Sequence, residues 1–155
     1  MAHIHEKIDF TSEVFIVYKS KVLLRIHDKY HKWLSVGGHI ELDEDPAEAA
    51  IREVKEEVGL NVALWNGNQR FFIDEPGVKE IIPPVFLNRH RVSDTHEHIT
   101  FVYFAQSDTD QLSLSDDEIS DECRWFTKEE LETIELAPNI RSYASLALDT
   151  LGSNV

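Results

Sequence analysis

The sequence predicts an α/β fold in which a mixed sheet lies between helices. Short runs of branched apolar residues alternate along the chain with two or three segments of helical periodicity. Such interleaving favours a sheet that helices cover on both faces. The length of 155 residues suggests a single domain over residues 1–155. A domain of this size buries roughly 70% of the surface that its unfolded chain exposes.

The predicted strands are short runs of apolar and β-branched residues. The first two span residues 13–18 and 21–27, and a tight turn at Lys19 and Ser20 joins them. Residues 32–42 continue as a third extended piece, interrupted by Gly37 and Gly38; a glycine pair in a strand often marks a close approach of backbone. Further strands are expected at residues 61–66, 70–74, 98–105 and 123–126, and loops at residues 75–84 and 106–122.

A helix is expected after the glycine pair. Asp45 can cap its N-terminus, Pro46 stands at its first position, and Glu48 has the spacing of a capping box. Gly59 supplies the C-terminal stop. The apolar residues between these signals recur at helical spacing and predict the buried stripe of the helix: Ala47, Ala50, Ile51, Val54 and Val58.

Two more helices are expected near the C-terminus. Thr127 and Glu130 have the spacing of a capping box for a short helix. Pro138 opens the last helix, whose apolar residues keep helical spacing: Ile140, Tyr143, Ala144, Ala147, Leu148 and Leu151. Two tryptophans, Trp33 and Trp125, are expected to belong to the core or to a pocket wall.

Three glutamates gather in the second half of the first helix. Glu53, Glu56 and Glu57 stand at positions i, i+3 and i+4, so they share one face. Like charges at this spacing repel by roughly 0.2–0.5 kcal/mol per pair, and the helix dipole disfavours anions there. A run of charges on a helix is more often a solvated face. A bound cation would explain the cluster, and all-oxygen ligands favour Mg²⁺ or Mn²⁺ over Zn²⁺.

The net charge and the cysteine content limit the classes of ligand and the cellular compartment that fit this chain. A formal net charge of −14 argues against binding duplex nucleic acid, whose backbone attracts positive surfaces. A small anionic ligand is compatible with this charge, because local cations can reverse the field in a cleft. The single cysteine, Cys123, allows no disulfide within the chain and fits a reducing compartment. No segment has the pattern of a signal peptide or of a transmembrane helix, so we expect a cytoplasmic protein without membrane association.

The spacing around the glutamates resembles that of a known family. The pattern G-x5-E-x7-R-E-U-x-E-E-x-G-U, in which U is apolar, is the Nudix box. This chain is similar to it at every fixed position: Gly38, Glu44, Arg52, Glu53, Val54, Glu56, Glu57, Gly59 and Leu60. The likeness to MutT-like Nudix hydrolases extends to the strands before the box and to the segment CRWFTKEEL after it. One departure is Val36, which stands where many members carry proline.

The resemblance implies a Nudix-type α/β/α sandwich and a function. It implies a Mg²⁺-dependent hydrolase, with Mn²⁺ as an alternative ion, that cleaves the diphosphate linkage of a nucleoside diphosphate derivative or a nucleoside triphosphate. Arg52 would hold Glu53 in place through an ion pair, and Glu44 would brace the loop between Gly38 and the helix. The implied metal ligands are the Gly37 carbonyl and the carboxylates of Glu53, Glu56 and Glu57.

Two residues outside the box are candidates for contact with the substrate. Arg25 lies on the second predicted strand, where members of the family often place a basic residue against phosphates. The alternative is an ordinary surface arginine. Asn139 follows Pro138, where some nucleoside triphosphatases of the family touch the base, although an exposed asparagine at a helix start is the simpler explanation. One of the arginines that flank the predicted pocket wall is a further candidate: Arg70, Arg89 or Arg91.

Additional carboxylates and two histidines complete the set of candidates. Glu118, in the acidic loop, and Glu97 could each supply a further metal ligand or a general base. His96 and His98 share one face if their strand is regular. Two histidines alone do not make a Zn²⁺ site, which needs three or four ligands. We therefore expect them to be surface or substrate-side polar residues.

Two other functions fit parts of the sequence. An isopentenyl-diphosphate-isomerase-like enzyme would need a cysteine at the site, whereas Cys123 stands far along the chain, before Trp125. A non-catalytic nucleotide-sensing module often lacks the box glutamates, which are all present here. Substrate choice depends on the loops around residues 66–91 and 106–122, so the sequence does not select among diphosphate substrates. Homodimers are frequent in families that resemble this chain, and the sequence leaves the oligomeric state open.

Overall fold

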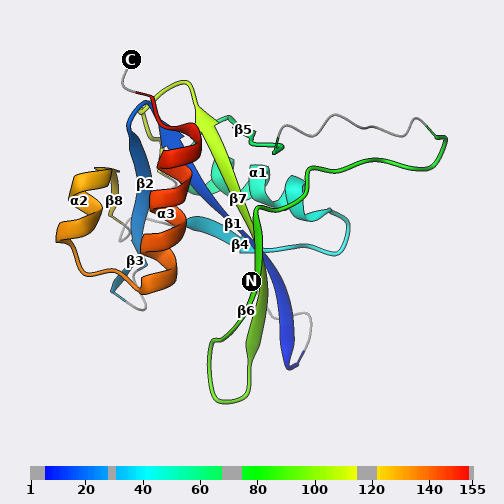
Figure 1. The fold of residues 1–155 in the computed structure, drawn as a ribbon. Helices are drawn as coiled ribbons and strands as arrows, with labels where there is room; N and C mark the ends of the chain where they lie inside the picture. Colours follow the sequence, from blue (N-terminus) through cyan, green and yellow to red (C-terminus); the bar gives the residue numbers. More distant parts are fainter. Residues whose placement is uncertain (1–5, 28–30, 68–74, 115–121, 154–155) are drawn as a thin grey trace.

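A computed structural model describes residues 6–27, 31–67, 75–114 and 122–153 of the chain. Figure 1 shows a twisted sheet with helices packed against it. The strands are β1 (Ile8–Tyr18), β2 (Lys21–His27), β3 (Lys32–Leu34), β4 (Val36–His39), β5 (Val62–Leu64), β6 (Phe86–Arg91), β7 (Glu97–Ser107) and β8 (Cys123–Thr127). The helices are α1 (Pro46–Val58), α2 (Lys128–Thr133) and α3 (Pro138–Leu151).

The sheet is mixed, as the sequence predicts. Its central path runs β3-β2-β1-β7-β5, while β4 pairs with β1, β6 with β7 and β8 with β2. The long central strands β1 and β7 are parallel, with Ile8 opposite Glu97 and Val17 opposite Gln106. All other strand pairs are antiparallel. Both long strands are buried through their second halves, which makes them the framework for the rest of the fold.

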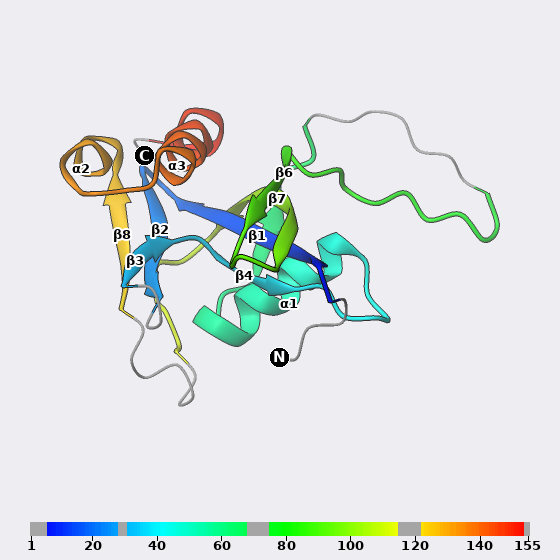
Figure 2. The same cartoon turned by 90° about the horizontal axis from the view of Figure 1, so that it is seen from below.

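Helices cover both faces of the sheet, so the fold is an α/β/α sandwich. Figure 2 shows α1 on one face and α2 and α3 on the other. Because side chains of a strand point alternately to its two faces, each face has its own apolar core. Phe15, Val17, Val102 and Phe104 pack toward α3, whereas Val14, Ile16, Tyr103 and Ala105 pack toward α1. Among the described residues, no helix is long and apolar enough to cross a membrane.

The helix signals of the sequence are confirmed. The Asp45 carboxylate accepts a hydrogen bond from the backbone N–H of Glu48 at 2.8 Å, and Gly59 ends α1 in the left-handed conformation. Thr127 and Glu130 form the reciprocal capping box of α2. The predicted stripe of α3 packs against the core, with Ile140, Ala144, Ala147 and Leu148 buried. Trp33 and Trp125 are partly buried against the two cores.

The sheet differs from the prediction in several places. The first strand begins at Ile8 rather than at residue 13, and the third extended piece divides into β3 and β4. Strand β6 was not predicted, because most of its side chains are exposed and polar. The stripe of α1 includes Ala49 instead of Ile51, which is 44% exposed. The strand expected at residues 70–74 lies outside the described residues.

Candidate functional site

The helix α1 presents two of its glutamates, Glu53 and Glu57, to the sheet rather than to solvent. Glu53 is 8% exposed and Glu57 is 6% exposed. Both therefore belong to the buried side of α1 together with Val54 and Val58. Glu56 is different, because its side chain is 60% exposed. Burying a carboxylate costs free energy of folding unless the carboxylate is paired. The partners of Glu53 and Glu57 therefore show how this face of the helix is stabilised.

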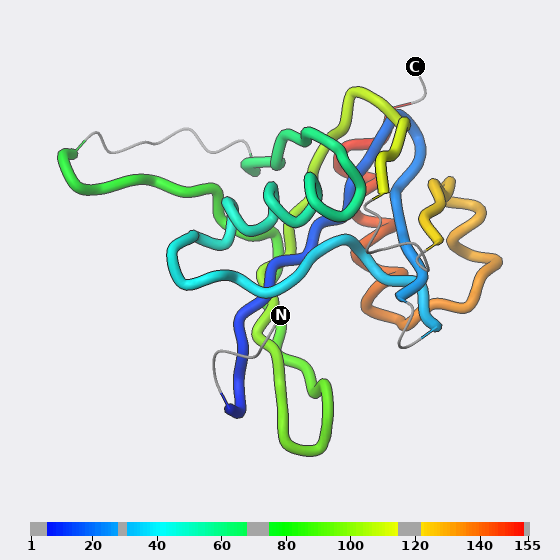
Figure 3. The backbone as a smooth tube through the Cα atoms, turned by 180° about the vertical axis from the view of Figure 1, so that it is seen from behind, coloured from blue at the N-terminus to red at the C-terminus, as the bar shows by residue number. Residues whose placement is uncertain are grey.

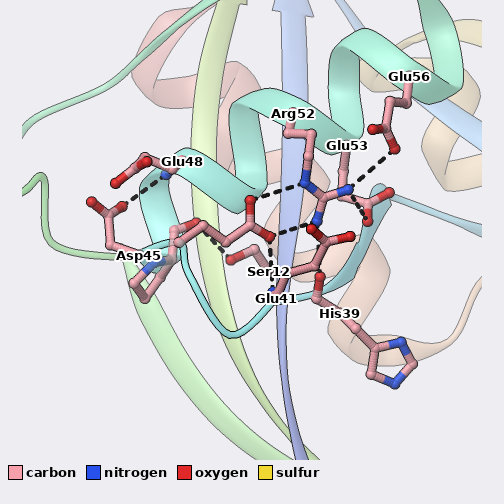
Figure 4. A network of polar contacts seen from close by, with 10 residues as sticks. Ser12, His39, Glu41, Asp45, Glu48, Arg52, Glu53 and Glu56 are labelled. Carbon is pink, nitrogen blue, oxygen red and sulfur yellow. Dashed lines mark hydrogen bonds and ion pairs between the residues drawn. The ribbon is translucent and has the colours of Figure 1, made fainter. Parts of the chain in front are cut away.

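Arg52 contacts several residues of the site at once (Figure 4). It forms a two-pronged pair with Glu44, in which Nε donates to Oε2 at 2.9 Å and Nη2 donates to Oε1 at 2.6 Å. Its Nη1 donates to Glu53 at 3.0 Å and to Glu56 at 3.1 Å. Its Nη2 also donates to the backbone carbonyl of His39 at 3.1 Å. One guanidinium thus joins the loop before α1, the helix itself and the end of β4.

The predicted roles of Glu44 and Arg52 agree with this geometry. Glu44 accepts a hydrogen bond from the backbone N–H of Glu41 at 2.9 Å, which closes the loop between β4 and α1. The hydrogen bonds from Arg52 hold the pKa of Glu44 below its usual value. In turn the carboxylates, Glu44 first among them, raise the pKa of Arg52. The pair stays fully ionised and fixes the orientation of the guanidinium that faces Glu53.

Arg25 pairs with a box glutamate. Its Nε lies 3.2 Å from Oε2 of Glu57, and both side chains are at least nine-tenths buried. The alternative of a surface arginine is therefore wrong, since Arg25 is only 7% exposed. Arg25 comes from β2 and Glu57 from the last turn of α1, so this ion pair ties the helix to the sheet.

The two glycines of β4 bring the backbone close to its neighbours. A β-carbon on Gly38 would lie 2.4 Å from Oε1 of Glu53, so the Glu53 carboxylate occupies the space that a side chain at Gly38 would need. A β-carbon on Gly37 would lie 2.2 Å from the backbone carbonyl oxygen of Ser12 on β1. The close approach that the glycine pair predicted therefore has two parts, one against α1 and one within the sheet.

The charge balance of the site suits a divalent cation. The network contains four carboxyl side chains, Glu44, Glu53, Glu56 and Glu57, and two guanidinium groups, Arg25 and Arg52, so its formal charge is −2. The donors are all oxygens, which a hard ion such as Mg²⁺ prefers. Because Gly38 has no side chain, the Glu53 carboxylate can lie directly against the backbone of β4. The residues present therefore fit the ion that the box implies.

The remaining predicted site residues do not contact the Arg52 network or lie outside the described residues. Asn139 is exposed in the first turn of α3. Glu97 forms a two-pronged ion pair with Arg89, at 2.8 Å and 2.9 Å, and this pair lowers the pKa of Glu97. Glu118 and Arg70 lie outside the described residues.

A polar cluster that the sequence did not reveal lies at the ends of β1, β4 and β7. Its members are Asp9, His39, His96 and His98. His96, expected to be a surface or substrate-side residue, is 8% exposed, and its Nε2 lies 3.0 Å from the Asp9 carboxylate. Burial first, and then the imidazoles of His39, His90 and His96, lower the pKa of His98 to about 4. Asp9 and His39 were missed because only the sheet register brings them to the two predicted histidines.

Two residues near the box were also not assigned to it from the sequence. Glu13 stands opposite Gly37 in the sheet, accepts a hydrogen bond from Ser35 at 2.9 Å, and has its pKa raised by burial. Cys123 pairs in register with Arg25 across β2 and β8. Its position far along the chain is therefore no argument that it lies away from the site.

Comparisons with solved structures agree with this fold. A hydrolase of the NUDIX family from Clostridium perfringens is 41% identical to this chain, with a TM-score of 0.80 over 92% of this chain and 97% of that one. A MutT NUDIX hydrolase from Burkholderia pseudomallei is 20% identical, with a TM-score of 0.62 over 94% of this chain and 99% of that one. At 20% identity the second likeness concerns the fold alone.

Sequence relatives match over shorter stretches. A "probable DHNTP pyrophosphohydrolase" from Lactococcus lactis is 30% identical over 104 residues, which are 65% of this chain and 56% of that protein. An uncharacterized Nudix hydrolase from Pseudomonas aeruginosa is 43% identical over 44 residues, 28% of this chain and 26% of that protein. The chain thus spans less than two thirds of the length of either relative. The family model described as NUDIX domain matches residues 11–146, most of the chain and the whole box, so the chain belongs to the Nudix family of hydrolases.

Proposed function

We propose that this chain is a Mg²⁺-dependent pyrophosphohydrolase, able to use Mn²⁺, that cleaves the diphosphate linkage of a nucleoside diphosphate derivative or a nucleoside triphosphate. The observation that carries the proposal is the Arg52 network, in which one guanidinium orients Glu44, Glu53 and Glu56 against the glycine-containing end of β4. Such a preorganised set of carboxylates fits a metal-dependent step better than a solvated helix face, because Glu53 and Glu57 are buried.

The residues of the proposed site have different roles. Glu53, Glu56, Glu57 and the Gly37 carbonyl would hold the ion. When bound, Mg²⁺ would polarise the phosphoryl group and lower the pKa of a coordinated water. Arg52 and Arg25 position the carboxylates to which they are paired. Phosphoryl transfer depends mainly on positioning and on charge stabilisation, which is what these fixed ion pairs supply.

Arg25, Asn139 and Glu118 are proposed contributors beyond the metal ligands. Arg25 pairs with Glu57 at 3.2 Å, and this contact with a proposed metal ligand supports a role for Arg25 in binding the phosphates. Asn139 is exposed at the start of α3 and would contact the nucleoside. Glu118 is the proposed general base.

The partner is proposed to be a small nucleotide or diphosphate, with no duplex nucleic acid and no membrane. The net charge of −14 supports a ligand that reaches its site through a bound cation rather than through a basic surface. A cytoplasmic location is supported by the single cysteine. We further propose that residues 1–155 act as one domain and that two copies associate as a homodimer.

A substrate panel tests the proposed function. Purified protein is incubated with nucleoside triphosphates (including oxidised ones), ADP-ribose, sugar nucleotides, dinucleoside polyphosphates and DHNTP, each with Mg²⁺ or Mn²⁺. Isopentenyl diphosphate is included because Cys123 lies opposite Arg25. We expect release of phosphate, pyrophosphate or a nucleoside monophosphate from at least one compound, and none in EDTA. Binding without turnover of any compound would instead support the sensing module, and isomerisation of isopentenyl diphosphate would support the isomerase.

A further inference from the structure

Three neighbouring strands bring metal-binding side chains together outside the Nudix box. The ligand atoms of Asp9, His39 and His98 all lie within 4.8 Å of one another. Nε2 of His39 lies 3.4 Å from Oδ2 of Asp9, and the rings of His39 and His98 meet edge to face with centroids 5.1 Å apart. The register explains the cluster, because Asp9 of β1 stands opposite His98 of β7, and β4 pairs with β1 as far as His39.

This cluster and the Nudix box lie on opposite faces of the sheet. Consecutive residues of a strand point to opposite faces. Gly38 faces Glu53 on α1, so His39 faces the other way, and Figure 4 shows its imidazole pointing away from the Arg52 network. Asp9 and Phe15 are separated by an even number of positions on β1 and so share one face, and Phe15 packs toward α3. Any ion held by the three side chains is therefore separate from the ion proposed for the glutamates.

The ligand atoms of Asp9, His39 and His98 favour some metal ions over others. Imidazole nitrogen suits Zn²⁺, Ni²⁺, Cu²⁺ or Fe²⁺, whereas Mg²⁺ prefers oxygen. Two histidines and one carboxylate match Zn²⁺ sites that keep a water in the fourth position. Asp9 is 1% exposed, and a carboxylate so deeply buried requires a positive partner.

One neighbouring residue supports occupation of the cluster by an ion. His96 places Nε2 3.0 Å from the Asp9 carboxylate and Nδ1 3.2 Å from the Glu6 carbonyl, and such outer contacts orient the ligands of metal sites.

We propose that Asp9, His39 and His98 form a second metal site, for a divalent ion of borderline softness such as Zn²⁺, with water completing the coordination. The ion would tie together β1, β4 and β7 where the sheet extends beyond α3 (Figure 1). It would also brace the Nudix box indirectly, because the backbone carbonyl of His39 accepts a hydrogen bond from Arg52.

The test measures binding of Co²⁺ and Zn²⁺ to the full, tag-free chain after removal of metal. Excess Mg²⁺ is present throughout to occupy the glutamates. We expect one equivalent of Zn²⁺ to bind by calorimetry, and Co²⁺ to give the visible absorption of a nitrogen- and oxygen-ligated ion. Replacing one ligand, in His98→Ala or Asp9→Asn, should weaken Zn²⁺ binding by at least about tenfold. The milder His98→Gln is a second variant in case His98→Ala does not fold.

Three control variants make the result specific. His27→Ala removes a histidine of β2, and a His3→Ala/His5→Ala double variant removes the two histidines near the start of the chain; both should keep wild-type affinity. The Glu53/Glu56/Glu57→Gln variant should also keep it, because those residues lie on the other face. The proposal is overturned if wild-type protein shows no saturable Zn²⁺ binding, which would mean that a protonated imidazole balances Asp9. Binding that is lost in the glutamate or N-terminal variant but kept in both His98 variants would overturn it as well.

Discussion

Arg52 contacts three carboxylates and a backbone carbonyl without being able to bind a cation itself. Its planar guanidinium has enough donors for all four contacts. The box spacing predicts the pairs with Glu44 and Glu53, because these residues belong to the same motif. The pair between Arg25 and Glu57 was not predictable, because it joins β2 to α1 and depends on the tertiary fold.

The buried glutamates are expected to dominate catalysis. We predict that Glu53→Gln and Glu57→Gln each lower kcat by at least about a hundredfold, with a smaller effect on KM, because the loss of one electrostatic contributor commonly has this size. Steady-state kinetics at saturating Mg²⁺ measures the effect. Glu132→Gln, an exposed glutamate of α2, is the matched control and should leave kcat unchanged. A near-wild-type kcat in either box variant would remove that residue from the proposed metal site.

Arg52 is expected to support catalysis only by orienting Glu53. We predict that Arg52→Ala lowers kcat by roughly ten- to hundredfold, the size usual for a residue that orients a metal ligand. Arg52→Lys should recover little of this loss, because an ammonium group cannot make the two-pronged contact with Glu44 while also reaching Glu53. The mutants should in addition require more Mg²⁺ for half-maximal activity. Full activity and an unchanged Mg²⁺ requirement in Arg52→Ala would show that another group holds Glu53.

The pair of Glu44 with Arg52 should be visible in the acid stability of the fold. Because the folded state lowers the pKa of Glu44, its contribution to the free energy of unfolding is complete above the unfolded pKa, near 4.5. It is lost as the pH falls through the lower, folded value. We expect wild-type protein to lose stability more steeply than Glu44→Gln between about pH 5 and pH 3. Urea unfolding across this range measures it, and parallel pH profiles of the two proteins would contradict it.

At the scale of elements, β4 and α1 build the site together. The close approach of backbone at Gly37 and Gly38 was predictable from the glycine pair, and the bounds of α1 from its caps. The strand β6 and the first half of β1 were not predictable, because both carry many polar side chains. In β1 these polar groups are satisfied inside the sheet, as in the 2.7 Å hydrogen bond between Thr11 and Thr100. Only the tertiary structure supplies such partners.

The two glycines should respond differently to the same substitution. A methyl group at Gly37 would meet the backbone of Ser12, which cannot move cheaply, so we predict that Gly37→Ala destabilises the fold by about 1–3 kcal/mol. A methyl group at Gly38 would meet the end of the flexible Glu53 side chain. Gly38→Ala should therefore cost less than about 1 kcal/mol of stability but lower kcat by at least about tenfold.

Denaturant unfolding and steady-state kinetics of both variants check this contrast. Because the two positions are adjacent, each variant serves as the control for the other. Equal losses of stability in the two variants, or wild-type kcat in Gly38→Ala, would contradict the proposed contact between Gly38 and Glu53.

At the scale of the whole molecule, the sheet separates two chemically different regions. Seen from behind, α1 lies in front of the sheet and α3 beyond it (Figure 3). The glutamates lie on the α1 side, and the histidine cluster lies on the other side. The sequence predicted the sandwich and the first region because motif and periodicity are local. It did not predict the second region, because Asp9, His39 and His98 are far apart in the chain and only strand pairing joins them.

The binding of Mg²⁺ by the box glutamates should stabilise the entire fold. An ion that binds only the native state contributes RT ln(1 + [L]/Kd), which is about 1.4 kcal/mol for an assumed Kd of ~1 mM and ~10 mM Mg²⁺. A domain of this size gains roughly 2–4 °C per kcal/mol, so the melting temperature should rise by about 3–6 °C. NaCl of equal ionic strength should do less, because screening lacks directed ligation.

Thermal melts of wild-type protein and of the Glu53/Glu56/Glu57→Gln variant, each in EDTA, in NaCl and in Mg²⁺, test the metal site most directly and need no substrate. Each protein is compared with its own melt in EDTA, because the variant also loses ion pairs to Arg25 and Arg52. We predict a Mg²⁺ shift of about 3–6 °C in wild-type protein and the loss of most of it in the variant. Equal Mg²⁺ shifts in the two proteins would show that these carboxylates do not hold the ion.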